Sequence, residues 1–429
     1  MTKIKAFRAV TYNQEKFKDL SRLLCPPYDV ISSERQQYFH DLDPHNFIRI
    51  VLGKDTPAED KYKRAAATFK DWLRERILIQ DDLPSLYFYS QEFSLKGEKK
   101  TRMGFIGLLH LGEKGPSALG HEHTSIEAKE DRFSLLKAVK ANLSPVFALF
   151  QDEKRVIAYI FEHYIKANSP YLSETDDKKT VHKLWKLQDP EILASIEAKM
   201  RNENIFIADG HHRYEVALAY REEMRRNSGR ISGEEDFNYV LCYFTNVKSR
   251  GLSILPIHRL VKTGEDFDMG GFLFKLKDYF DVERVKDKAR FFFLLEKGGQ
   301  TEHLLGMYRC KEYSLIRLKN VLIPDVKLKD KPKEYRSLDV SILNSLILDK
   351  ILKAGMSDKD NVTFSPCTQE LIEKADTDSA YIAFFLNSVK VEQILNLALK
   401  GEKMPPKTTY FYPKVLSGLV INKFNEGKS

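Results

Sequence analysis

The spacing of apolar and polar residues predicts short strands and helices that alternate along most of the chain. Runs rich in β-branched and aromatic residues are typical of strands, and they lie at residues 4–10, 46–52, 146–151, 182–187, 238–246, 254–260 and 381–386. Two more strands are expected between residues 86 and 111, joined by the polar turn Lys96-Gly97-Glu98. Apolar residues at helical spacing predict helices, and these lie at residues 60–76, 131–140, 338–352 and 391–398. The pattern therefore predicts a mixed α/β (α+β) fold.

One segment joins a strand, a tight turn and a helix through an unusual set of side chains. An apolar run at residues 205–208 leads into Asp-Gly-His-His-Arg at 209–213, and apolar residues at helical spacing follow. Asp209 is expected to cap that helix. Basic residues in a first turn are unfavourable for an empty helix, because that end carries about +0.5 charge. A bound phosphate, held by free backbone N–H groups and by Arg213, would explain them.

Composition narrows the class of protein. The 429 residues carry 42% hydrophobic and 30% charged side chains, which is typical of a soluble globular protein. The sequence shows no membrane-spanning run and no leader, and its four cysteines are far apart, so a cytoplasmic protein without disulfides is expected. The net charge of +8 is spread among acidic residues, which argues against a nucleic-acid partner.

Two N-terminal segments carry candidate chemistry. His121-Glu122-His123 lies in a Gly-containing loop, where it forms a metal site, an active-site loop with Glu122 as general base, or a solvated polar loop. In Cys25-Pro-Pro-Tyr28-Asp29 the two prolines exclude a helix. Asp29 could hold Mg²⁺ or a substrate amine near a phosphate, whereas Cys25 is expected to be a structural thiol.

The segment 402–418 alternates prolines, lysines, hydroxyls and aromatic residues, and it is too stiff for a helix. One interpretation is a tail that packs on the core. The other is a strap over the anion site, with Lys407 and Lys414 as counter-charges and Thr408 and Thr409 as donors. The His258-Arg259 pair at a strand end is a weaker signal of the same kind.

Several motifs recur together in one known family. The resemblance rests on Cys-Pro-Pro-Tyr-Asp-Val-Ile-Ser from residue 25, Gly-Phe-Ile-Gly-Leu at 104–108, the His-Glu-x-Thr segment at 121–124, Ala-Asp-Gly-His-His-Arg-Tyr-Glu at 208–215 and Lys-Thr-Thr-Tyr-Phe-Tyr-Pro-Lys at 407–414. The chain resembles a full-length member of a chiefly bacterial and archaeal family that is catalogued as a conserved domain of unknown function.

A narrower resemblance concerns the 209–213 motif and the loop at 26–29. Both resemble the phosphate-binding patches of free-serine kinases with a ParB/sulfiredoxin-like fold. This implies a core over residues 1–265, made of patches 1–52 and 200–262 around an insertion 53–199, with a C-terminal α/β subdomain over 266–429 and the strap 402–418. The sulfiredoxin cysteine is replaced by His211, so sulfinic-acid repair is not expected.

The resemblance implies a nucleotide-dependent phosphotransferase that uses ATP or ADP with Mg²⁺ on a small hydroxyl substrate, best free L-serine or phosphoserine. The expected nucleotide-binding residues are Asp209, Gly210, His211, His212, Arg213, Lys407, Thr408 and Lys414. Catalytic candidates are Glu122, Glu34, Asp29 and His212, and substrate-binding candidates are Tyr28, Asp29, His121 and Arg132. No metal ligand is certain, although Asp29 or Asp209 could hold Mg²⁺.

Two alternatives remain open at this point. One is a non-enzymatic nucleotide sensor of the ParB type, and the other is a metal-dependent phosphohydrolase built on His121, His123 and His211. A homo-oligomer is left open as well.

Overall fold

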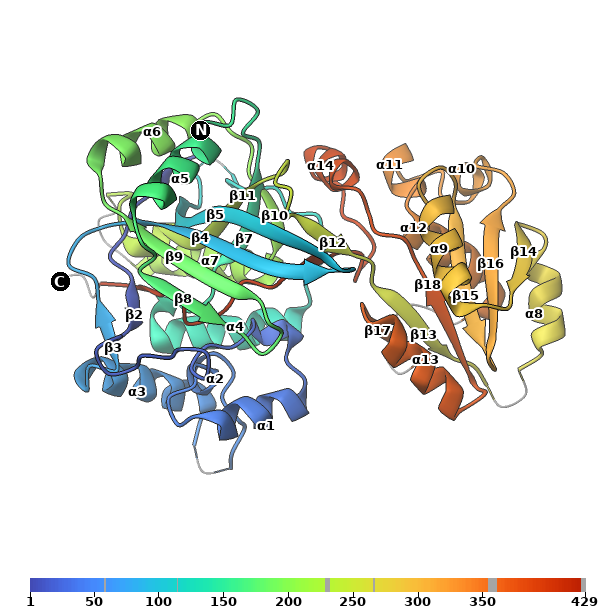
Figure 1. Cartoon of the computed structure of the whole chain (residues 1–429), viewed down its shortest axis with the longest axis horizontal. Coiled ribbons are helices and arrows are strands. Elements are labelled where there is room, and N and C mark those ends of the chain that lie inside the picture. The colour runs from blue at the N-terminus through green and yellow to red at the C-terminus, as the bar shows by residue number, and fades with distance from the viewer. Residues whose placement is uncertain (58, 114, 228–231, 265–266, 354–360, 426–429) are drawn as a thin grey trace. The chain divides into compact units, whose positions relative to one another are not determined.

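The computed structural model describes residues 1–57, 59–113, 115–227, 232–264, 267–353 and 361–425. The chain packs into two compact units. The first contains Met1–Gly120, Thr124–Leu252 and Pro413–Ser429, and the second contains His121–His123 and Ser253–Tyr412. Strands and helices mix in both units, so the expected mixed α/β class is confirmed (Figure 1).

A mostly antiparallel sheet organises the first unit. Within the described residues its strand order is β10-β7-β11-β5-β4-β9-β8, with β1 paired to β5, and β7 and β11 run parallel. The bounds are β1 Ile4–Lys5, β4 Leu86–Leu95, β5 Glu98–His110, β7 Val146–Phe150, β8 Leu172–Thr175, β9 Val181–Leu187, β10 Phe206–Asp209 and β11 Tyr239–Asn246. Two short pairs accompany it, β2 Val10–Tyr12 with β3 Leu78–Gln80, and β6 Ala141–Asn142 with β20 Asn422–Lys423.

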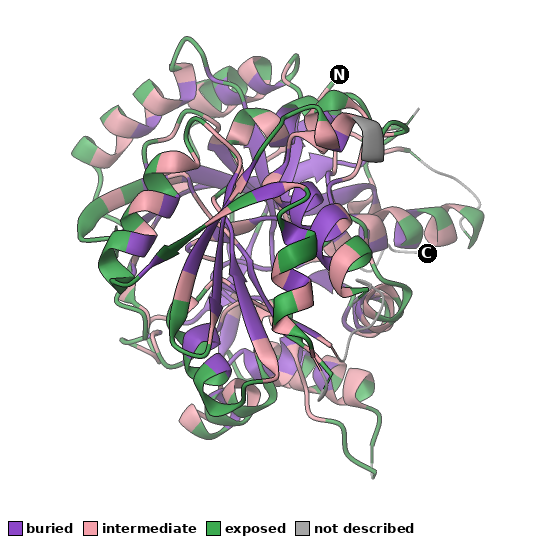
Figure 2. Cartoon of the chain, turned by 90° about the vertical axis from the view of Figure 1, so that its right-hand side faces the viewer, coloured by how far each residue is buried: buried purple, intermediate pink, exposed green. Residues whose placement is uncertain are grey.

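Helices of the first unit surround this sheet. They are η1 Tyr28–Val30, α1 Ser33–Leu42, α2 Ile48–Val51, α3 Lys61–Arg74, α4 Ile126–Val139, α5 Val156–Ala167, α6 Pro190–Met200, α7 His211–Asn227 and η2 Asp236–Asn238. Helix α3 begins after Asp60, whose carboxylate accepts from the backbone N–H groups of Tyr62 and Lys63. Buried residues concentrate on strands, whereas the helices carry exposed residues on their outer faces (Figure 2).

The two faces of the first sheet differ in character. One face carries the aromatic core, in which Phe105 and Phe244 stack with centroids 4.9 Å apart and Phe88 meets Phe161 of α5 at 4.6 Å. Side chains alternate along a strand, so Tyr89 of β4 and other residues between these positions face the opposite side. That opposite face contains buried polar groups, and the candidate site lies there.

A second antiparallel sheet organises the second unit. Its described strands follow the order β14-β16-β15-β18-β13-β17, and β12 pairs separately with β19. The bounds are β12 Ser253–Leu255, β13 His258–Lys262, β14 Phe280–Val285, β15 Leu304–Arg309, β16 Glu312–Leu318, β17 Val362–Ser365, β18 Tyr381–Phe385 and β19 Tyr410–Tyr412. The helices are α8 Met269–Leu276, α9 Lys288–Gly298, α10 Ile323–Lys327, α11 Lys333–Arg336, α12 Asp339–Ile342, η3 Leu343–Leu352, α13 Thr368–Thr377 and α14 Val391–Leu399.

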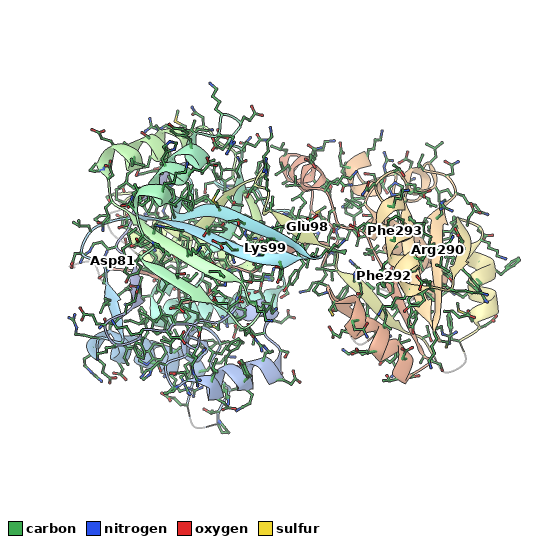
Figure 3. All side chains as sticks on the ribbon, viewed as in Figure 1. Asp81, Glu98, Lys99, Arg290, Phe292 and Phe293 are labelled. Atoms are coloured by element: carbon green, nitrogen blue, oxygen red, sulfur yellow. The ribbon has the colours of Figure 1, made fainter. Side chains whose placement is uncertain are left out.

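Helix α9 shows how amphipathic spacing anchors a helix to this second sheet. Phe291 and Leu295 are buried in the core cluster, whereas Phe293 is 63% exposed. Phe292 packs against the same cluster, and Figure 3 labels it beside Phe293 on α9. The helix is therefore held by its i and i+4 positions.

Three expectations about where helices lie need correction. The strand expected at 46–52 is wrong, because Ile48–Val51 form helix α2. Ile48, Ile50 and Val51 are all buried, and an apolar run without alternation does not distinguish a helix from a strand. Helix α4 begins at Ile126 instead of 131, since Ser125 caps it by accepting from the Ala128 N–H. The expected helix at 338–352 is α12 followed by η3, where the hydrogen-bond spacing widens to that of a π-helix.

The polar turn between β4 and β5 is confirmed, and it requires a positive φ at Gly97. Lys96 and Gly97 both have positive φ, 52° and 81°, as a two-residue type I′ hairpin turn requires. We expect Gly97→Ala to lower the free energy of unfolding by about 1–2 kcal/mol, because a Cβ disfavours this backbone region. Chemical denaturation measures it, with Lys99→Ala beside the turn (Figure 3) as a neutral control. Equal stability of the two variants would contradict this turn geometry.

Candidate functional site

The candidate site begins where β10 ends and α7 starts. Gly210 has a φ of +88°, and its carbonyl accepts the first helical hydrogen bond, from the Tyr214 N–H at 3.1 Å. Gly210 therefore precedes the helix, and the expectation that Asp209 caps it is wrong. A Cβ on Gly210 would lie 2.8 Å from the guanidinium carbon of Arg213. Glycine thus allows Arg213 to fold back over the turn.

The Asp209 carboxylate is shared between two cations. Its Oδ2 accepts from Arg213 Nη2 at 2.9 Å, and its Oδ1 accepts from Lys414 Nζ at 2.6 Å. The side chains are only 17% exposed for Asp209 and 11% for each cation. Burial alone would raise the pKa of Asp209, but Lys414 and Arg213 outweigh it and hold that pKa well below its usual range. The carboxylate is therefore ionised at neutral pH.

A third cation lies within the electrostatic reach of this carboxylate. Arg102 of β5 is fully buried, and it donates from Nε to Gln91 Oε1 at 3.1 Å and from Nη2 to the Pro413 carbonyl. Its guanidinium also lies 4.5 Å from the ring centroid of Phe147. Burial lowers the pKa of Arg102, while Tyr243, Tyr89 and Asp209 oppose that change. Three cationic side chains are thus concentrated around Asp209.

The Pro-rich loop contributes to the same region. Tyr28 of η1 lies under the Arg132 guanidinium at 4.1 Å, and Arg132 pairs with Asp131 through Nε at 2.8 Å. Burial and the charge of Asp29 raise the pKa of Tyr28 to about 12, while Arg213 and Arg132 act in the opposite direction. Tyr28, Arg132 and Arg213 line one cavity of about 60 Å³. That volume exceeds what one water needs.

The histidines of the motif have different surroundings. His211 is buried, and it contributes to the lowering of the Asp209 pKa. The His212 Nε2 accepts a hydrogen bond from the Ser125 N–H at 3.0 Å, so this ring contacts the residue that caps α4. Its neighbour Glu215 accepts from the Thr124 hydroxyl at 2.6 Å. A catalytic role for His212 stays a prediction. The contact between His212 and Ser125 holds the start of α4.

Within the second unit, the 121–123 loop lies against the chain before β19. The Thr409 hydroxyl donates to Glu122 Oε1 at 3.1 Å and lies 3.2 Å from His121 Nε2. The Met404 N–H donates to the His121 carbonyl at 2.7 Å. His121, Glu122 and Thr409 are thus grouped in the second unit. In the first unit Tyr28, Arg132, the 209–213 motif and Lys414 form the other group.

The remaining candidates lie in exposed or structural positions. Glu34 in the first turn of α1 and Asp29 in η1 are exposed, and the Ser32 hydroxyl lowers the pKa of Glu34. Lys407 is exposed, and the Thr408 hydroxyl donates to the Pro405 carbonyl. Cys25 is buried, which raises the pKa of its thiol as expected for a structural residue. Among the residues that the structure describes, no group of three His, Cys, Asp or Glu side chains could hold a metal ion.

Arg102 and Gln91 are site residues that sequence reasoning missed. Arg102 follows Lys99, Lys100 and Thr101 in the sequence and so resembles the exposed half of a hairpin. One of its hydrogen-bond partners is the carbonyl of Pro413, a residue 311 positions away. No local signal in the sequence carries that information.

The sequence was compared with models of protein families and with curated proteins. A family model described as "Protein of unknown function (DUF1015)" matches residues 4–341. No curated protein matches in sequence. No helix in the described part of the chain is long and apolar enough to cross a membrane.

Distant structural similarity extends to several solved structures. A free serine kinase variant in complex with AMP has a TM-score of 0.36 at 11% identity, covering 71% of this chain and 87% of that one. A variant in complex with ADP has a TM-score of 0.35 at 11% identity, covering 71% and 87%. C-terminally truncated SbnI from Staphylococcus aureus has a TM-score of 0.36 at 10% identity, covering 73% and 85%.

The shared Asp209 carboxylate generates a stability prediction. Asp209→Asn leaves two largely buried cations without their counter-charge, so we expect the free energy of unfolding to fall by about 3–5 kcal/mol. The matched control is Asp177→Asn, because Asp177 pairs with Arg35 where both side chains are more than a third exposed. There we expect a loss of at most about 1 kcal/mol. Denaturant titration of both variants measures the difference, and equal losses would contradict the role of Asp209.

The pH dependence of that difference follows from the lowered pKa of Asp209. A carboxyl group whose folded pKa lies below its unfolded value of about 3.9 stabilises the fold above that pH. The stabilisation disappears as pH falls toward the folded pKa. We therefore expect the gap between the parent and Asp209→Asn to be constant near neutrality and to shrink below about pH 4. A gap that does not narrow in acid would show that Asp209 is not paired as described.

Proposed function

This chain belongs to the DUF1015 family of proteins of unknown function, and we propose that its first unit is a nucleotide-dependent phosphotransferase. The best candidate substrate is a small hydroxyl compound, free L-serine or phosphoserine, with ATP or ADP as the nucleotide. The observation that carries this proposal is the concentration of Arg213, Lys414 and Arg102 around one carboxylate at the start of α7. Phosphoryl transfer needs such charge neutralisation more than covalent chemistry.

The local backbone supports phosphate binding at this point. The first N–H groups of a helix lack intrahelical partners, and α7 starts directly after a glycine with positive φ. A phosphate oxygen could accept from these groups and from Arg213, whose buried Nε has no hydrogen-bond partner within the described residues. Charge-assisted contacts of this kind are roughly twice as strong as neutral ones. The residues from 210 to 213 would therefore hold the transferred phosphate.

The other roles follow from position. Lys414 would neutralise the phosphate from the C-terminal segment, while Tyr28 and Arg132 line the adjoining cavity where the acceptor would bind. Mg²⁺ would be held by Asp29, or by Asp209 once one of its two cations has moved to the phosphate, and it would neutralise charge on the phosphates. Asp29 is the exposed carboxylate of the loop next to Tyr28, so within the first unit it is the best placed candidate for the base.

A nucleotide sensor is the second candidate function. Both Asp209 oxygens already accept from cations, so an entering phosphate would have to exchange with an existing ion pair. Such an exchange changes the connection between α7 and the C-terminal segment, which is what a sensor requires. Binding without transfer would support this alternative.

Arg213→Ala tests the proposed function directly. Loss of a charge-assisted contact costs about 1.5–3 kcal/mol, so we expect ADP affinity to fall by about tenfold to a hundredfold and transfer to stop. The matched control is Arg226→Ala, because Arg226 is exposed on the same helix. Calorimetric titration with ADP and exchange of labelled phosphate between ATP and L-serine provide the readouts, beside a thermal melt.

The outcomes separate the candidates. A parent protein that binds ADP and labels L-serine, with both lost in Arg213→Ala and kept in Arg226→Ala, supports the kinase. ADP binding without any exchange supports the sensor. The proposal is contradicted if the parent protein binds no nucleotide, or if a folded Arg213→Ala variant exchanges labelled phosphate at the parent's rate. Lys414→Gln serves as a second variant if Arg213→Ala does not fold.

A further inference from the structure

The second unit contains a pocket of its own that the proposed function does not use. Its volume is about 230 Å³, and it is lined by the loop after α9, the start of α12 and the loop between β18 and α14. Uncharged hydrogen-bonding side chains such as Asn387, Gln393 and Thr408 are mixed with apolar ones such as Ile257. The pocket is smaller than sites for drug-sized ligands, which start at about 300 Å³. It suits a small polar molecule.

An oriented histidine lines this pocket. His303 Nδ1 lies 2.8 Å from Asp339 Oδ1, and both side chains line the cavity. The carboxylate can only accept, so Nδ1 carries a proton and donates to it, and in the neutral tautomer the lone pair of the ring lies on Nε2. Within the described residues Nε2 has no hydrogen-bond partner. His303 is thus prepared to accept a hydrogen bond from a ligand.

A buried cation lies directly behind the pocket wall. Arg259 of β13 is fully buried, and it donates to the carbonyls of Ile257 and Lys407. Ile257 lines the pocket, as does Thr408, the residue after Lys407. Among the described residues no carboxylate pairs with Arg259, its Nε has no hydrogen-bond partner, and burial lowers its pKa to about 9. A buried charge without a counter-ion is costly, and a bound anion would compensate it.

The other charged side chains of the pocket do not cancel the positive charge of Arg259. Glu302 accepts from Arg317 Nε at 2.7 Å, which offsets its charge, whereas Asp339 accepts only a hydrogen bond from the His303 ring. Lys390 lines the rim just before α14, and within the described residues its ammonium forms no ion pair. The cations Arg317, Arg259 and Lys390 therefore outnumber the carboxylates Glu302 and Asp339 at this pocket, and within the described residues neither Arg259 nor Lys390 forms an ion pair.

We propose that this pocket binds a small metabolite that carries both an oxyanion, carboxylate or phosphate, and a hydroxyl group. The oxyanion lies toward Lys390, where the charge of Arg259 behind the wall attracts it, and the hydroxyl donates to His303 Nε2. The proposal rests on the second unit alone. It stands whether or not the first unit transfers phosphate.

The test uses D-glycerate and glycerol with the full chain, because the two probes share a carbon skeleton and differ in the carboxylate. We expect calorimetric titration to detect D-glycerate binding at millimolar concentration or below, and no binding of glycerol. His303→Gln and Lys390→Gln should each weaken D-glycerate binding at least tenfold. His163→Gln, at an exposed histidine of the first unit, is the matched control and should bind as the parent does.

Inorganic phosphate distinguishes the two sources of the oxyanion. Phosphate binding that is lost in His303→Gln but kept in Arg213→Ala assigns a phosphate headgroup to this pocket. Phosphate binding that is lost only in Arg213→Ala belongs to the first unit, and the pocket ligand is then a carboxylate if D-glycerate binding depends on His303. The proposal is overturned if neither probe shows binding that depends on His303.

Arg259→Met supplies an independent readout. Removing a buried unpaired charge should leave the melting temperature of the unliganded chain unchanged or higher, while the rise in melting temperature caused by D-glycerate should shrink. A variant that keeps the full D-glycerate response would overturn the role of Arg259. If this variant does not fold, Lys390→Gln decides whether a cation attracts the ligand.

Discussion

The Asp209 carboxylate and its two cations are the interaction on which the first unit depends. Arg213 reaches it from within the same turn, whereas Lys414 reaches it from the C-terminal segment, 205 residues further along the chain. The same segment supplies the Pro413 carbonyl to Arg102, the Ser417 N–H to the Cys25 carbonyl, and strand β20 to β6. The 26–29 loop, strand β10 and the C-terminus are therefore held together around one buried charge.

Two buried cations around a single carboxylate are unfavourable for stability alone, and for this reason we propose that a ligand binds there. Moving a cation from water into a protein interior costs several kcal/mol even after relaxation, and a single carboxylate compensates only part of this cost for two cations. Glycine at position 210 adds a backbone requirement, because a Cβ there would collide with the folded-back Arg213. A phosphate with two negative charges would match this site better than the carboxylate alone. Electrostatics thus connects the stability of the unit to its proposed chemistry.

The sequence pattern correctly predicted those elements whose structure is determined by residues close together in the chain. The β4–β5 hairpin follows from strand residues around Lys96-Gly97, and the strand–turn–helix at 205–220 follows from a change of apolar period. The predictions failed where burial on all sides removes the alternation of apolar and polar residues, as in α2. They also failed where a side chain contacts residues that are distant in the sequence. Asp209 has a side chain suited to capping, yet two cations compete for it and Gly210 takes the position before α7. Arg102 gave no signal, because its buried partners include Phe147 and the Pro413 carbonyl, which lie far from it in the sequence.

Arg102 and Arg259 are both fully buried, yet their charges have different surroundings. Arg102 donates to neutral oxygens, but Tyr243, Tyr89 and Asp209 stabilise its charge against burial. Arg259 also donates to carbonyls, yet burial alone shifts its pKa, to about 9. Arg102 is therefore largely compensated within the fold, whereas Arg259 has the most to gain from an anion that the chain itself does not supply. That difference is the physical reason to seek a ligand in the second unit as well as in the first.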